Sequence, residues 1–109
     1  MSLLSRTEEL LLLSVWHLQE DAYGLAVRDR MRQLLDRKLS VGAVYVPLER
    51  LARKGFLASR EADPTPERGG RRTRYYRLTE KGVAALAHVR SVTEEAWAGV
   101  PSPLSPSVR

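Results

Sequence analysis

The residues with the clearest chemistry are five arginines between positions 68 and 77, with no acidic residue among them. Guanidinium groups stay charged and donate paired hydrogen bonds to phosphate oxygens, so they are suited to binding a polyanion. Residues 50–81 hold ten Lys and Arg against four Asp and Glu, whereas the rest of the chain holds eight against nine. The net charge of +5 therefore comes from one stretch, which predicts a localised polyanion-binding surface.

Other kinds of site have little support. The chain lacks cysteine, and His17 and His88 have no neighbouring residues at metal-ligand spacing, so we expect no metal and no cofactor. A glycine-rich phosphate loop, a nucleophile elbow and a Ser/His/Asp order are also missing from the sequence, so we do not expect an enzyme. The longest apolar run, residues 10–13, is too short for a membrane span, and we expect one cytoplasmic domain.

Hydrophobic spacing predicts the elements that position the arginines. Ser5 and Glu8 have the spacing of a capping box, which predicts a first helix over residues 6–18 that is apolar almost all round. A second, amphipathic helix is predicted from the spacing of Val27, Met31, Leu34 and Leu35. Ser40 is the expected N-cap of a third helix, whose inner side would carry Val41, Val44, Leu48 and Leu51 before Gly55 ends it.

Two short strands are predicted next, over residues 56–61 and 72–78, with a reversal at Gly69 and Gly70. Thr79 then caps a fourth helix that is longer than so small a core requires. The predicted fold is mainly α, of α+β class, in the order helix, helix, helix, strand, strand, helix. This is the order of a winged helix-turn-helix, in which the third helix enters the DNA major groove.

Three stretches closely resemble the PadR family of bacterial transcriptional regulators, over about residues 5–90. They are DAYGLAVRDRMRQLLDR, VGAVYVPLERLARKGFLASRE and RGGRRTRYYRLTEKG. The resemblance implies a homodimer with a recognition helix, a wing and a C-terminal dimerisation helix. We therefore expect a winged helix-turn-helix DNA-binding domain over residues 5–78, a dimerisation helix over 79–100 and a disordered tail over 101–109.

One proline departs from the family pattern. Many relatives have proline directly after the tyrosine of the third helix, whereas here Val46 separates Tyr45 from Pro47. If the helix begins at Val41, Pro47 removes one backbone hydrogen bond and should kink it. A start near Val44 would avoid that conflict, and the sequence does not decide between the two.

The predicted DNA contacts lie on the third helix and the wing. Ala43 and Val46 could touch thymine methyl groups, but the helix start has no Asn, Gln or Arg for bidentate base reading. Specificity should then depend on DNA shape and on the wing, whose arginines suit phosphates or a narrow minor groove. The full expected set is Ser40, Gly42, Ala43, Tyr45, Val46, Arg50, Arg53, Arg68, Arg71, Arg72 and Arg74.

The dimer interface is expected to combine the first and fourth helices. Its predicted residues are Leu11, Val15, Leu86, Val89, Thr93 and Trp97. Trp97 offers a flat surface that could also line a pocket for a small aromatic or hydrophobic inducer between the subunits. Trp16 is expected to lie in the core or at an interface, and one of Tyr75 and Tyr76 should lie in the core because they alternate across a strand.

These observations predict a homodimeric repressor that binds a double-stranded DNA operator and has no membrane partner. The resemblance to the PadR family further implies that it responds to a ligand. Two alternatives remain open at this stage. The chain could be an architectural protein that binds DNA without sequence preference, because the outer face of the third helix begins with small residues. It could also be a winged-helix interaction module that binds an acidic protein.

Overall fold

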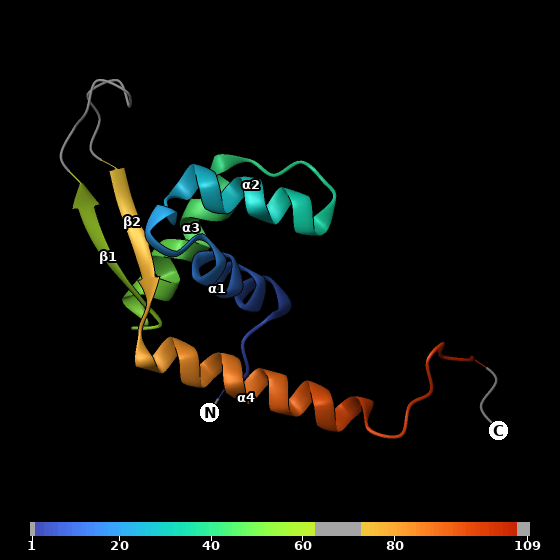
Figure 1. The fold of residues 1–109 in the computed structure, drawn as a ribbon. Coiled ribbons are helices and arrows are strands. Elements are labelled where there is room, and N and C mark those ends of the chain that lie inside the picture. Colours follow the sequence, from blue (N-terminus) through green and yellow to red (C-terminus); the bar gives the residue numbers. More distant parts are fainter. Residues whose placement is uncertain (1, 63–72, 107–109) are drawn as a thin grey trace.

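The structure, a computed structural model, describes residues 2–62 and 73–106. Its elements are α1 (Arg6–Leu18), the short 3-10 helix η1 (Gln19–Asp21), α2 (Gly24–Leu35), α3 (Val41–Arg53), β1 (Leu57–Ala62), β2 (Thr73–Leu78) and α4 (Glu80–Trp97). In Figure 1, α1, α2 and α3 form one body, the hairpin stands at its side, and α4 runs beneath it and beyond it. The predicted winged helix-turn-helix order is confirmed.

Side-chain caps fix the starts of three helices. The Ser5 hydroxyl accepts the N–H of Glu8 at 3.1 Å, and the Ser5 N–H donates to the Glu8 carboxylate at 2.8 Å. Ser40 caps α3 through the N–H of Ala43, and Thr79 caps α4 through that of Gly82, both at 3.1 Å. The first N–H groups of a helix have no partner within it, so these bonds favour the starts that the sequence predicted.

The α3 helix begins at Val41 and contains Pro47. Of the two starts that the sequence left open, the earlier is therefore the observed one, and the ring of Pro47 removes one hydrogen bond inside the helix. The predicted end is also observed, because Gly55 takes a φ of 87° directly after the last turn. That left-handed backbone favours glycine and turns the chain into β1.

The core is built around α1, which packs on α2, α3, α4 and β2. Leu11 and Val15 are 1% and 2% exposed, so their own chain already encloses them. This corrects their assignment to the dimer interface. Most of this helix, apolar almost all round, is covered by elements of the same chain because α1 lies at the centre of the fold.

A short segment before α2 extends the sheet. Strands β1 and β2 pair antiparallel, from Leu57 opposite Leu78 to Ala62 opposite Thr73. Tyr23 forms an isolated bridge with Tyr75, and the N–H of Tyr76 donates to Ala22 at 2.8 Å. Tyr76 belongs to the core cluster, as expected for one of the two tyrosines, and Tyr75 is also buried because this segment covers the free edge of β2.

Two apolar side chains that the sequence placed on inner helix faces, Leu34 and Val41, are exposed, and Trp16, expected in the core or at an interface, is exposed on its own chain. Leu34 is 45%, Val41 39% and Trp16 54% exposed. Leu34 lies in the last turn of α2 and Val41 is the first residue of α3, so the apolar stripes of these two helices are uncovered at those ends. No helix in residues 2–62 and 73–106 is both long and apolar enough to cross a membrane.

Candidate nucleic-acid interface

The outward face of α3 is open to solvent along its length. Val44, Leu48 and Leu51 point into the core, and the opposite side of the helix is exposed. All the predicted contacts on this helix and its cap lie on that open side, namely Ser40, Gly42, Ala43, Tyr45, Val46, Arg50 and Arg53. The face has a small, apolar start and a basic end, and the uncovered helix is free to enter a groove of DNA.

Tyr45 is held at the junction of α2 and α3. Its ring lies over Gly24, the first residue of α2, where a methyl group would be 2.8 Å from the Cε1 atom of the ring. The contact explains why α2 begins with a glycine, since a larger residue there would collide with the Tyr45 ring. Tyr45 remains 37% exposed, so it can also present its hydroxyl group to a ligand on the open face.

A carboxylate on α3 joins the recognition helix to the hairpin. Tyr76 donates its hydroxyl hydrogen to Oε2 of Glu49, and Arg74 donates from Nη1 to Oε1 at 2.8 Å. Arg74 also donates from Nη2 to Oε1 of Glu61 at 3.4 Å. Arg74, expected to contact DNA, is therefore held between two acidic side chains.

The pKa values of Glu49 and Tyr76 are shifted so that the carboxylate stays ionised and the phenol stays protonated. The hydrogen bond from Tyr76 lowers the pKa of Glu49, burial opposes that effect, and Arg74 lowers the pKa further. Burial and the hydrogen bond to Glu49 raise the pKa of Tyr76, so its hydroxyl remains a donor. Glu49 is thus ionised at neutral pH and offsets the charge of Arg74.

The sequence analysis placed Glu49 on the outward face but gave it no role. The available signal was its charge, since it is the acidic residue on a face that otherwise ends in Arg50 and Arg53. The predicted contacts Arg68, Arg71 and Arg72 lie outside the described residues. On the described strands, Arg60 stacks over the ring of Tyr75 at 4.6 Å from its centroid.

The C-terminal part of α4 is exposed to solvent, whereas its first turns pack on the core. Ala85 and Val89 are each 8% exposed, and Leu86 packs beside them on the core. Val89 is therefore used within its own chain, which corrects its assignment to the dimer interface. Beyond it Thr93 is half-buried, whereas Val92 and Trp97 are 39% and 56% exposed.

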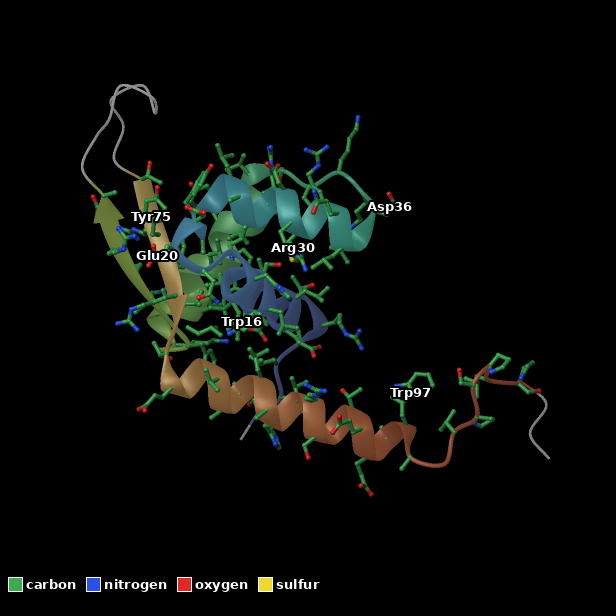
Figure 2. The ribbon with its side chains drawn as sticks, in the orientation of Figure 1. Trp16, Glu20, Arg30, Asp36, Tyr75 and Trp97 are labelled. Carbon is green, nitrogen blue, oxygen red and sulfur yellow. The ribbon has the colours of Figure 1, made fainter. Side chains whose placement is uncertain are left out.

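Figure 2 shows the two tryptophans far apart, Trp16 between α1 and α4 and Trp97 at the distal end of α4. Trp16 borders an open pocket of about 640 Å³ between the end of α1, strands β1 and β2 and the start of α4. Tyr75, Arg60 and Val83 also line it. The described residues contain no group of three or more His, Cys, Asp or Glu that could hold a metal ion.

The comparison with protein families decides the assignment. Residues 12–88 match the transcriptional regulator PadR-like family, and this match covers more than half of the chain. The chain belongs to the PadR-like family. This PadR-like protein is accordingly a DNA-binding transcriptional regulator.

Solved structures show the same fold. A PadR family regulator from Eggerthella lenta is 26% identical, with a TM-score of 0.68 over 94% of this chain and 87% of that chain. A PadR-like transcription factor from Bacteroides fragilis is 23% identical, with a TM-score of 0.70 over 83% and 82%. RosR of H. salinarum is 19% identical, with a TM-score of 0.69 over 91% and 82%. No curated protein matches the sequence.

Proposed function

We propose that this PadR-like regulator is a cytoplasmic homodimer that represses transcription by binding a pseudo-palindromic operator. The observation that carries the proposal is the open face of α3, with small apolar side chains at its start and Arg50 and Arg53 at its end. In a winged helix-turn-helix this face enters the major groove while the hairpin reaches the neighbouring backbone or minor groove. Residues 5–78 then form the DNA-binding unit.

The contacts divide by chemistry. Ala43 and the 56% exposed Val46 would touch thymine methyl groups. The phosphate contacts on α3 and its cap would be Ser40, Tyr45, Arg50 and Arg53. We propose further phosphate contacts from the wing, by Arg68, Arg71 and Arg72. Without a bidentate base-reading side chain at the start of α3, sequence preference would depend largely on DNA shape.

The uncovered end of α4 supports the dimer. Trp97, Val92 and the half-buried Thr93 offer apolar surface beyond the part of the helix that packs on its own chain, and Leu86 borders it. A second copy of residues 79–100 would cover this surface. Two recognition helices would then meet half-sites about one helical turn, roughly 10 base pairs, apart.

The start of α4 is bonded to the end of α3, which would transmit the dimer geometry to the recognition helix. The Thr79 hydroxyl donates to the carbonyl of Gly55 at 2.6 Å, and the Lys81 ammonium donates to that of Lys54 at 2.7 Å. A small aromatic or hydrophobic inducer bound beside Trp97 between the subunits would shift the two α4 helices and thereby misplace both α3 helices.

The proposal can be tested by fluorescence anisotropy at physiological salt, with the duplex just upstream of the protein's own gene and a scrambled duplex of equal length. We expect the native duplex to bind at least about 10³-fold more tightly, as is typical of sequence-specific regulators. Equal binding of both duplexes would favour the architectural alternative. Binding of neither would favour the protein-interaction module.

A further inference from the structure

We propose that Glu49 competes with DNA phosphates for Arg74 and thereby limits the part of the DNA affinity that does not depend on sequence. The inference rests on the proposed function, because it requires that α3 and the hairpin approach the same DNA. It assigns a role to an acidic residue on the recognition helix. It also revises the expectation that Arg74 is a free phosphate contact.

The geometry places Arg74 where a phosphate could reach it. Arg74 is the second residue of β2, at the end of the strand that adjoins residues 63–72. It pairs with Glu61 of β1. Its side chain is 40% exposed, and it contacts Glu49 on the recognition helix. A guanidinium in this position, between α3 and the wing, lies beside the path of the DNA backbone in the proposed complex.

Glu49 already holds the hydrogen-bonding edge that a phosphate would use. Nη1 of Arg74 donates to Glu49 and Nη2 donates to Glu61, so both terminal nitrogens face carboxylates. A guanidinium binds phosphate most strongly with two parallel N–H groups, in the same way that it binds a carboxylate. A phosphate can therefore gain both N–H groups of this edge only when Glu49 releases Nη1 and the longer bond from Nη2 to Glu61 also opens.

Tyr76 holds the Glu49 carboxylate in the competing position. The Tyr76 ring is 2% exposed and belongs to the core, and its hydroxyl donates to Oε2 of Glu49. The other oxygen, Oε1, is left to face Arg74 at 2.8 Å. Both oxygens of the carboxylate thus accept a hydrogen bond. Leu48, the residue before Glu49 on α3, is fully buried and anchors this part of the helix in the core.

The consequence for binding follows from counterion release. Each cation that neutralises a phosphate adds affinity for every DNA sequence and steepens the dependence on salt. A regulator must leave the many competing sites of a chromosome, so an arginine withheld from phosphates lowers the affinity for all of them. Glu49 therefore sets how tightly the protein holds DNA in general and leaves the ratio between operator and other DNA unchanged.

The test uses the full chain and the two duplexes described above, titrated across a range of salt concentrations. Glu49→Gln keeps an amide oxygen to accept from Tyr76 but removes the negative charge that holds Arg74. We expect E49Q to bind both duplexes about threefold to fivefold more tightly, within the range of one half-exposed ion pair. The salt slope should become steeper by about 0.9, as for one added phosphate contact.

A double-mutant cycle with Arg74→Gln separates the proposed competition from simple charge repulsion. In the R74Q background, E49Q should change neither the affinity nor the salt slope. An equal gain in that background would overturn the proposal, because Glu49 would then act by repelling DNA directly. Glu61→Gln is the matched control, since it removes a carboxylate from the same guanidinium at the longer distance of 3.4 Å and should have a smaller effect.

Failure of the inference differs from failure of the proposed function. If wild-type protein prefers the native duplex while E49Q has unchanged affinity and salt slope, the role of Glu49 is wrong and the DNA-binding proposal stands. An E61Q effect as large as that of E49Q would likewise overturn the role of Glu49. If wild-type protein binds neither duplex, both proposals are overturned.

Discussion

The α-carbon of Gly82, near the start of α4, lies against the backbone carbonyl of Phe56, which follows the last turn of α3. A methyl group on Gly82 would be 3.2 Å from the carbonyl carbon of Phe56 and closer still to its oxygen. The same carbonyl oxygen accepts the N–H of Thr79 at 3.2 Å. The start of α4, the proposed dimerisation helix, therefore packs directly on the backbone that follows α3, the recognition helix.

Gly82→Ala should destabilise the protein by roughly 2 kcal/mol, because the new methyl group meets backbone that can move only if α4 moves. Gly24→Ala is the matched control in another helix, where the methyl group would meet the tip of the Tyr45 ring. That tip can rotate toward solvent, so the loss of stability on Gly24→Ala should stay below about 1 kcal/mol. Urea unfolding measures both, and equal losses would contradict the assigned contact.

Arg53→Ala should weaken binding of the native and the scrambled duplex by the same factor and make the salt slope less steep by about 0.9. The reason is that Arg53 lies at the basic end of the open α3 face, where it would contact a phosphate. Arg6→Ala removes the same charge from the start of α1, where the Arg6 side chain is 75% exposed, and serves as control. Anisotropy titrations at several salt concentrations compare the two variants.

The lowered pKa of Glu49 predicts a pH dependence of stability. The Tyr76 hydrogen bond lowers this pKa, burial opposes it, and Arg74 and Arg53 lower it further, so it lies below the ordinary value of 4.5. The unfolded chain then takes up this proton at a higher pH than the folded chain does. Its contribution to stability is therefore complete above pH 4.5 and is lost as pH falls through the folded pKa.

Urea unfolding at neutral pH and at a series of acidic values tests this dependence. The free energy of unfolding should fall more steeply with acid in the wild type than in Glu49→Gln, which has no such carboxyl. Parallel curves for the two proteins would show that Glu49 has the same pKa in the folded and unfolded chains.

Trp97→Ala should weaken self-association and operator binding together, because the exposed indole at the end of α4 supplies apolar surface to the proposed dimer. Leu25→Ala is the control, since Leu25 on α2 is 47% exposed, close to the 56% of Trp97. Analytical ultracentrifugation gives the association state and anisotropy gives the affinity. A wild-type monomer with full operator affinity would refute the dimer.

Local features of the sequence determined most of the fold. The caps at Ser5, Ser40 and Thr79 each join groups three residues apart, so residue type and spacing are sufficient to predict them. The inner stripe of Val44, Leu48 and Leu51 likewise follows from helical periodicity. These patterns also placed the open face of α3, which carries the described part of the candidate site.

Only the tertiary structure decided which of the predicted site residues are exposed to a partner and which are already bonded or buried within the chain. Glu49 and Arg74 are 25 residues apart, and their ion pair exists because α3 packs on β1 while the register of the two strands brings Arg74 of β2 to the same side. Leu11 and Val15 are enclosed for the same kind of reason, since α1 is surrounded by elements distant in sequence. Contacts between elements depend on where helices and strands cross, and the spacing of residues within one element does not encode that.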